Sequence, residues 1–110
     1  MGRLEYLELP VGDRAAAKRF YAEAFGWSFS DFGPDYAATT SGDTDLGLDA
    51  APDKVRAPLP VIRVADLEAT LGAVEAAGGT IVVPIFAFPG GRRFHFRDVD
   101  GHELAAMQSG

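Results

Sequence analysis

The chain has 110 residues, of which 47% are hydrophobic and 24% are charged, and its formal net charge is −6. This length fits one compact domain with its own core, and the absence of cysteine excludes disulfides, thiolate metal sites and a cysteine nucleophile. The negative net charge argues against nucleic acid or a membrane as a binding partner. The sequence shows neither a signal peptide nor an apolar run of ~20 residues, so we expect a cytoplasmic protein.

The first half of the chain predicts a strand, a helix and three further strands. Leu7 to Pro10 forms the first strand, and Asp13 stands at the N-cap position, where its carboxylate can accept hydrogen bonds from the first helical turn. Gly26 can adopt the left-handed conformation that ends a helix. The residues spaced as one buried helix face are Ala17, Phe20, Tyr21 and Ala24. The expected strands are Trp27 to Phe32, Tyr36 to Thr40 and Leu46 to Asp49, with a turn at Ser41-Gly42-Asp43.

The second half predicts the same series of elements after a proline-rich connector, Ala50 to Pro60. A strand from Val61 leads to a second N-cap, Asp66, and Gly78-Gly79 ends the helix. The buried helix face is expected to contain Leu67, Leu71 and Val74. The expected strands are Thr80 to Val83, Arg93 to Arg97 and Glu103 to Met107, with a glycine-rich rim loop at Pro89 to Arg93 and a three-residue hairpin loop at Val99-Asp100-Gly101.

The two halves repeat each other at a constant offset. Val11 and Val64, Asp13 and Asp66, and Gly26 and Gly79 each stand 53 positions apart, which aligns a strand end, a helix start and a helix stop. We therefore expect an α+β fold with two βαβββ modules in tandem. One domain, residues 1–110, would contain module one over about 1–50, the connector over about 51–58 and module two over about 59–110.

The order of the motifs resembles that of the vicinal-oxygen-chelate (VOC) superfamily, which includes glyoxalases, bleomycin-resistance proteins and extradiol dioxygenases. Its opening signature is similar to Val11-Gly12-Asp13, Phe20-Tyr21 and Phe25-Gly26-Trp27. Its terminal hairpin is similar to Phe96 to Leu104, with Val99 and His102 replacing the usual proline and asparagine. The resemblance implies a half-open, concave mixed sheet around a ligand cavity, with helices on the convex face, usually completed in a homodimer.

Metal-dependent members of this superfamily use four ligands on the first and last strands of the two modules. In this sequence the resemblance places those positions at Tyr6, at Gly47, at Leu59 or one residue to either side, and at Glu103. Only Glu103 is an ordinary metal ligand, whereas a stable site for zinc or a similar ion needs three or four. We therefore predict neither a metal ion nor another cofactor.

The terminal hairpin contains the candidate catalytic residues, His95 and Glu103. A three-residue loop would pair Asp98 with His102 and would place Arg97 opposite Glu103. Strand alternation then divides the hairpin into a polar set for the concave face, Arg93, His95, Arg97 and Glu103 with Ala105, and an apolar set for the helices, Phe94, Phe96 and Leu104. His95 could transfer a proton. Alternatively, an Arg97–Glu103 pair only stabilises the hairpin while His95 is solvated.

Other residues are candidates for ligand binding. Tyr6 and Glu8 share one face of the first strand, and Arg63 could reach the same cavity or extend into water. Trp27 could form an aromatic ligand wall or part of the core, and Arg97 could bind an anion. His102, in the hairpin turn, is expected to be exposed.

These observations favour a VOC protein that binds a small organic molecule without metal, in a homodimer. The alternative is a metal-independent isomerase or lyase that uses His95 and Glu103. A divalent-metal lactoylglutathione lyase or dioxygenase is disfavoured by the ligand count.

Overall fold

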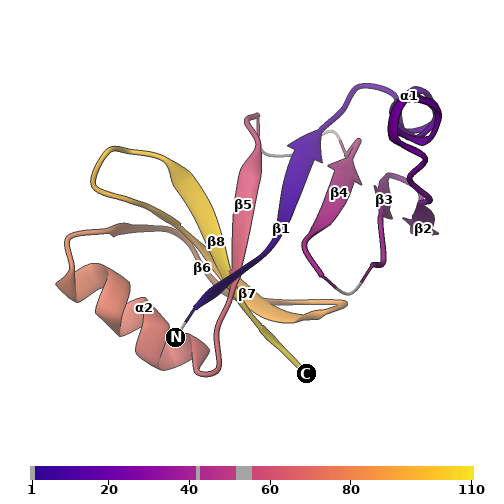
Figure 1. The fold of residues 1–110 in the computed structure, drawn as a ribbon. Helices are drawn as coiled ribbons and strands as arrows, with labels where there is room; N and C mark the ends of the chain where they lie inside the picture. Colours follow the sequence, from indigo (N-terminus) through magenta and orange to yellow (C-terminus); the bar gives the residue numbers. More distant parts are fainter. Residues whose placement is uncertain (1, 42, 52–55) are drawn as a thin grey trace. The chain divides into compact units, whose positions relative to one another are not determined.

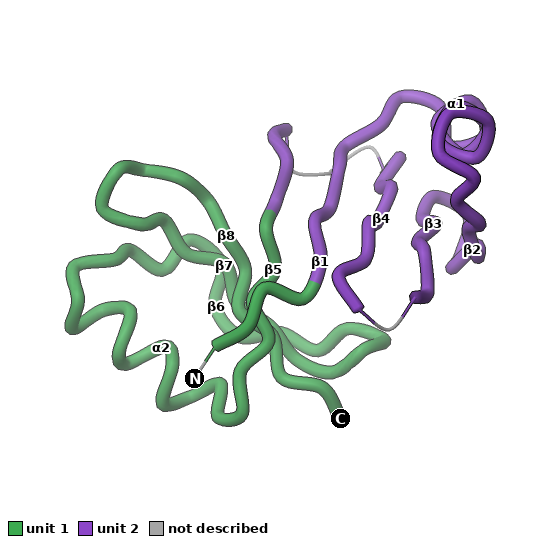
Figure 2. The backbone as a smooth tube through the Cα atoms, in the orientation of Figure 1, with its two compact units in different colours: residues 1–5, 60–110 green, residues 6–59 purple. Residues whose placement is uncertain are grey.

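The computed structural model describes residues 2–41, 43–51 and 56–110. The chain divides into two compact units, unit 1 with residues 1–5 and 60–110 and unit 2 with residues 6–59 (Figure 2). Neither helix in the described part of the chain has the length and apolar character needed to cross a membrane.

Unit 2 contains a four-stranded mixed sheet and one helix, except that the first three residues of β1, up to Glu5, belong to unit 1. Its hydrogen-bonded strand order is β2-β3-β4-β1, with β1 parallel to β4 and the other pairs antiparallel (Figure 1). The elements are β1 (Arg3–Pro10), α1 (Arg14–Phe25), β2 (Ser30–Phe32), β3 (Tyr36–Ala38) and β4 (Asp45–Asp49). In the β1–β4 ladder Glu8 lies opposite Gly47, between the leucine pairs Leu7–Leu46 and Leu9–Leu48. Because side chains alternate along strands, Glu8 and Gly47 belong to one face and the leucines to the other.

Unit 1 repeats this order of elements. Its strand order is β5-β8-β7-β6, with β5 parallel to β8 and the other pairs antiparallel. The elements are β5 (Leu59–Arg63), α2 (Leu67–Ala76), β6 (Thr80–Phe88), β7 (Gly91–Arg97) and β8 (Glu103–Ser109). A buried cluster of Leu67, Phe94 and Ala106 joins α2 to β7 and β8, and Leu71 and Val74 pack against it. The predicted buried face of the second helix is therefore confirmed.

Local signals at the helix ends and in the last hairpin are also confirmed. Asp13 and Asp66 accept hydrogen bonds from the backbone N–H groups of Ala16 and Ala69, at 3.1 and 3.0 Å. Gly26 and Gly78 have the positive φ angles 72° and 99°. Gly101 has a φ of 88°, and the Asp98 N–H donates to the His102 carbonyl at 3.0 Å, which closes the three-residue loop.

The buried face predicted for the first helix is wrong. No residue of α1 is buried, and Phe20 is 59% exposed. Its aromatic rings pack on one another: the Tyr21 ring centroid lies 5.1 Å from Phe20, 6.3 Å from Phe25 and 5.6 Å from Trp27. Helical spacing shows which residues share a face, but it does not show whether another element covers that face.

Several strand boundaries also differ from the prediction. Residues 27–29 lie outside strand β2, residues 39–40 outside β3, and β1 begins four residues before Leu7. The predicted glycine-rich rim loop is only a two-residue turn, Pro89-Gly90, because β6 extends to Phe88 and Gly91 is a buried residue of β7. The turn predicted at Ser41-Gly42-Asp43 includes Gly42, which lies outside the described residues.

Candidate functional site

A buried carboxylate and a tyrosine form the polar centre of unit 2. Glu8 is only 6% exposed, whereas a carboxylate usually lies in water. The strand positions on either side of it are leucines. The Tyr36 hydroxyl donates a hydrogen bond to Glu8 Oε2 at 3.0 Å. A buried acid needs such donors because it has lost its contacts with water.

The Tyr36 phenol remains a hydrogen-bond donor over a wide range of pH. Burial raises the pKa of Tyr36 well above its ordinary value, and the neighbouring Glu8 carboxylate and Tyr6 raise it further. A phenolate beside a buried carboxylate would place two negative charges together, so the protonated form is favoured. Tyr36 can therefore hold Glu8 in one orientation while Tyr6 lies beside the pair.

The Tyr36 side chain also occupies the space that a side chain at position 47 would need. A Cβ atom built on Gly47 would lie 2.0 Å from the Tyr36 hydroxyl oxygen and 2.8 Å from its Cζ atom. Gly47 therefore allows close approach of the tyrosine, and no larger residue fits while Tyr36 keeps this position.

The residues at the four superfamily metal positions do not fit a divalent ion. Gly47 has no donor and its space is filled by Tyr36, while Leu59 is an apolar residue that is 1% exposed. Tyr6 is a phenol, a poor ligand at neutral pH, and Glu103 is hydrogen bonded to His95. Within the described residues no group of three or more His, Cys, Asp or Glu side chains could hold a metal ion.

Unit 1 has its own polar pair, His95 and Glu103. His95 Nδ1 lies 2.8 Å from Glu103 Oε2, with the histidine side chain 5% exposed and the glutamate side chain 25% exposed. Both residues belong to the sheet face opposite Phe94 and Ala106, which pack with α2. The predicted register is confirmed, since Arg97 pairs with Glu103 across the ladder. Arg97 is exposed, however, and the carboxylate bonds His95 instead of the arginine.

One aromatic ring lies beside His95 in unit 1, and a cation–π cluster adjoins it. The Phe86 ring lies 5.9 Å from the His95 ring, and the Arg93 guanidinium lies 5.5 and 5.3 Å from the rings of Phe86 and Phe88. Val83 pairs with His95, and the β6–β7 register shifts on both sides of Val83. Such bulges are frequent beside active sites, where they redirect side chains.

His95 Nε2 is buried and lacks a hydrogen-bond partner among the residues that the structure describes. Most buried polar atoms are paired, so an unpaired one needs a reason. Within the described residues, the hydrogen-bonding capacity of this nitrogen is therefore unused.

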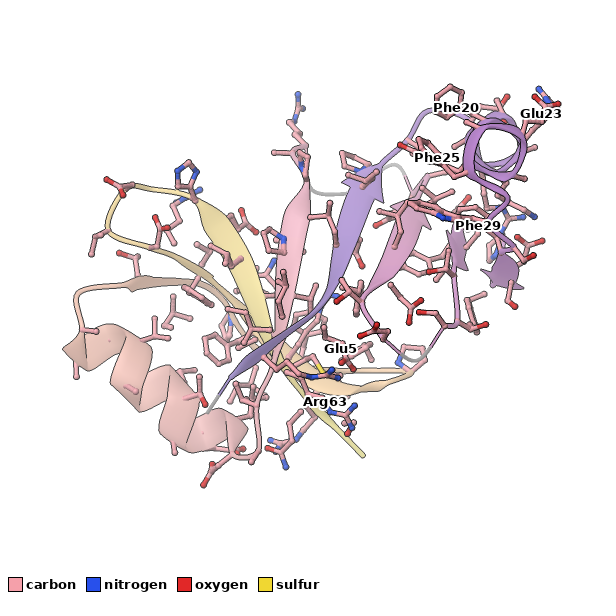
Figure 3. All side chains as sticks on the ribbon, in the orientation of Figure 1. Glu5, Phe20, Glu23, Phe25, Phe29 and Arg63 are labelled. Atoms are coloured by element: carbon pink, nitrogen blue, oxygen red, sulfur yellow. The ribbon has the colours of Figure 1, made fainter. Side chains whose placement is uncertain are left out.

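The other predicted site residues have partners outside these two pairs. Arg63 is exposed and bonds Glu5, at 3.1 Å, and Ser109, and Figure 3 shows Glu5 and Arg63 side by side. Trp27 is 42% exposed and stacks on Tyr21. His102 is exposed in its turn, as expected.

The sequence interpretation missed Tyr36 and Phe86. Gly47 gave the available signal for Tyr36, because a glycine between two strand leucines indicates close approach by another group. Nothing near Phe86 in the sequence indicated that it would contact His95, since the prediction ended that strand at Val83.

Comparisons with known proteins agree with this fold. The family model described as Glyoxalase/Bleomycin resistance protein/Dioxygenase superfamily matches residues 3–106. Two curated proteins named "Putative glyoxylase CFP32", from Mycobacterium bovis and Mycobacterium tuberculosis, are 28% identical over 120 residues, covering 98% of this chain. The alignment covers 46% of each of them, so the chain spans less than half their length.

Solved structures share the fold at low sequence identity. The Mn(II)-bound glyoxalase from Novosphingobium aromaticivorans has a TM-score of 0.72 and 24% identity, over 98% of this chain and 40% of that one. The methylmalonyl-CoA epimerase from Mycobacterium tuberculosis has a TM-score of 0.76 and 16% identity, over 97% and 87%. A Streptomyces coelicolor methylmalonyl-CoA epimerase variant in complex with 2-nitronate-propionyl-CoA has a TM-score of 0.78 and 17% identity, over 97% and 96%. The predicted fold of two tandem βαβββ modules is therefore confirmed.

Proposed function

Since the chain belongs to the Glyoxalase/Bleomycin resistance protein/Dioxygenase superfamily, we propose that it binds a small organic molecule without a metal ion. The observation that carries this proposal is the position of Tyr36, whose hydroxyl occupies the space of a side chain at Gly47 and bonds Glu8. A hydrogen-bonding group thus replaces a potential metal ligand. Binding would then depend on hydrogen bonds and packing instead of coordination.

Two partly buried polar pairs support this binding role. Glu8 bonds Tyr36 and His95 bonds Glu103, and Glu8 and His95 themselves are only 6% and 4% exposed. Desolvating a carboxylate or an imidazole is unfavourable, so such pairs are frequent where a protein recognises or transforms a ligand. Tyr6 and Glu8 are our proposed ligand contacts in unit 2, His95 is our separate candidate in unit 1, and Trp27, Arg63 and Arg97 remain predictions from the sequence.

We expect the ligand to contain a carbonyl or carboxylate group. Two solved structures of methylmalonyl-CoA epimerase with this fold contain CoA esters, 2-nitronate-propionyl-CoA in one and methylmalonyl-CoA in the other. Oxygen atoms of such a ligand could accept a hydrogen bond from Tyr6 in unit 2. Small carboxylic acids and acyl thioesters are therefore the first compounds to test.

Metal dependence can be measured directly. Protein without a tag is incubated with Zn(II), Ni(II), Mn(II) or Fe(II), desalted and analysed by elemental mass spectrometry, and we expect far less than one ion per chain. Titrations of small acids and thioesters with and without EDTA should then give the same affinities. Two results would contradict the proposal. One is a wild-type protein that retains about one metal ion per chain while the Glu103→Ala variant retains none, and the other is a ligand whose affinity rises more than tenfold when metal is added.

A second candidate function is metal-independent isomerisation or elimination. The contact between His95 Nδ1 and Glu103 Oε2 favours it, because a histidine oriented by a carboxylate is a common general base. A lactoylglutathione lyase or dioxygenase activity would require the metal that the measurement above tests for.

We also propose that the chain forms a homodimer in the cytoplasm. Phe25 and Trp27 are 60% and 42% exposed with ring centroids 5.3 Å apart, and Phe20 and Phe25 both contact Tyr21, so unit 2 presents neighbouring aromatic rings to solvent. Exposed apolar patches often mark protein interfaces. Sedimentation velocity at tens of micromolar should show a dimer, and Phe20→Asp with Phe25→Asp should weaken it. A monomer at that concentration would contradict this part.

A further inference from the structure

We infer that two copies of this chain pair through the exposed face of α1, with the two helices antiparallel and related by a two-fold axis. In this arrangement Arg19 of each chain lies opposite Glu23 of the partner subunit. The inference rests on the homodimer proposed above and names the surface that forms it. It does not depend on the proposed small-molecule site.

One face of α1 is exposed along the length of the helix. The opposite face contacts β3 and β4 of unit 2. Ala15, Arg19 and Glu23 are exposed, and because they stand four residues apart they form one stripe, with the exposed Phe20 beside it. Figure 3 shows Phe20 and Glu23 projecting outward from α1. The Phe20 ring is 59% exposed, and the small side chain of Ala15 leaves room for another helix to approach.

The charges on this face lack partners, unlike the other charges of α1. Arg14 and Lys18 lie 3.8 and 2.8 Å from the Asp31 carboxylate. Arg19 and Glu23 form no ion pair among the residues that the structure describes. A cation four residues before an acid is the less favourable order for pairing within one helix. The exposed face therefore presents one charge of each sign to a partner.

This pattern of charges is complementary to itself. In a two-fold contact, residue i of one subunit meets residue j of the other, and j meets i. Arg19 and Glu23 stand at equal distances on either side of position 21, so antiparallel helices that cross at this level form the Arg19–Glu23 contact twice. Phe20 is one residue from the crossing, so the two Phe20 rings meet near the axis. Parallel helices would instead place each charge against its own copy.

The charges explain why the partner is a second copy in one orientation. Each chain has a net charge of −6, so two copies repel each other unless the surfaces that meet are locally complementary. Complementary charges determine the orientation of a complex, and buried aromatic rings supply much of its affinity. The exposed face of α1 has both features, in Arg19 with Glu23 and in Phe20.

The first test reverses one charge at a time and measures dimerisation by sedimentation velocity. We expect Arg19→Glu and Glu23→Arg each to raise the dimer dissociation constant at least about tenfold, because each homodimer then contains two like-charge contacts. Glu75→Arg makes the same substitution at an exposed position of α2 and should leave the constant unchanged. Far-UV circular dichroism checks that each variant is folded. Charge variants that dimerise as tightly as wild type would overturn the inference.

The second test mixes the two variants in equal amounts. A chain with Arg19→Glu carries two acids on this face, and a chain with Glu23→Arg carries two cations, so all contacts of the mixed dimer are again between opposite charges. With a fluorescent label on one variant, sedimentation should show a mixed dimer with an affinity close to that of wild type. Failure of the mixture to recover the dimer would rule out the antiparallel arrangement.

A third measurement uses the wild-type protein and needs no folded variant. Hydroxyl-radical labelling read by mass spectrometry reports the exposure of phenylalanine rings at protein concentrations below and above the dissociation constant. Phe20 should be protected in the dimer, while Phe32, 52% exposed on β2, is the internal control and should be labelled equally in both. Equal labelling of Phe20 at the two concentrations would place the dimer contact elsewhere and overturn the inference.

Failure of this inference is distinguishable from failure of the proposed homodimer. A protein that stays monomeric at tens of micromolar would contradict both. A dimer that ignores the two charge variants would leave the homodimer standing and overturn only the pairing through α1.

Discussion

Replacing Gly91 with alanine should destabilise the protein by about 3–5 kcal/mol, an effect among the largest of single substitutions. Gly91 is buried at the start of β7 and has a φ of 145°, which L residues rarely adopt. An added Cβ would lie 2.1 Å from the Gln108 carbonyl oxygen and 2.9 Å from the Ser109 Cα atom. These are backbone atoms of the neighbouring strand, so the end of the β7–β8 ladder would have to separate.

Two glycines provide controls for this substitution. Gly101 has a φ of 88° but open space around its Cβ position, so Gly101→Ala isolates the backbone strain, expected at about 1 kcal/mol. Gly12 has neither a positive φ nor a close neighbour, so Gly12→Ala should be nearly neutral. Urea denaturation followed by far-UV circular dichroism measures all three. A Gly91→Ala protein within about 0.5 kcal/mol of wild type, the range of ordinary surface substitutions, would show that this strand pairing is wrong.

Replacing Gly47 with alanine should cost about 2–4 kcal/mol, because several unfavourable effects coincide. The new methyl group would lie 2.0 Å from the Tyr36 hydroxyl oxygen, so the tyrosine ring would have to move. Its movement would break the hydrogen bond to Glu8, whose carboxylate is only 6% exposed. The buried acid would then lose one of its donors, and the displaced ring would lose its packing.

A double-mutant cycle tests whether Tyr36 causes this loss. Tyr36→Ala should itself be destabilising, because it removes both the ring and the donor to Glu8. On that background Gly47→Ala places a methyl group in vacated space, so it should cost at least about 2 kcal/mol less than in the wild-type protein. Equal costs of Gly47→Ala on the two backgrounds would show that Tyr36 does not fill the space beside Gly47.

The sequence predicted the features that depend on near neighbours. Each helix cap needs only a carboxylate and an N–H group three residues away, as for Asp13 and Ala16, so the cap is visible in the sequence. The last hairpin is similar, because a three-residue loop ending in Gly101 determines the register of β7 on β8. That register placed His95 and Glu103 on one sheet face, although the bond between them runs diagonally instead of straight across the ladder.

Features that depend on distant pairing could not be predicted. The contact of Glu8 with Tyr36 depends on the strand order β3-β4-β1 and on the register of the β3–β4 and β1–β4 ladders. The sequences of such short strands determine neither the strand order nor the register.

The exposure of the aromatic face of α1 could not be predicted for a different reason. Phe20 and Tyr21 are spaced as a buried face, but burial depends on what lies above them, and in unit 2 they contact other aromatic rings.

The aromatic group around Trp27 also determines what optical spectroscopy can observe in this protein. Trp27 is the single tryptophan, and all three tyrosines, Tyr6, Tyr21 and Tyr36, belong to unit 2 with it. Emission excited at the red edge of the absorption band therefore reports on unit 2 alone, while unit 1 contributes only weak phenylalanine absorption. A transition recorded by tryptophan fluorescence and one recorded by backbone signals would coincide only if both units unfold as one cooperative system.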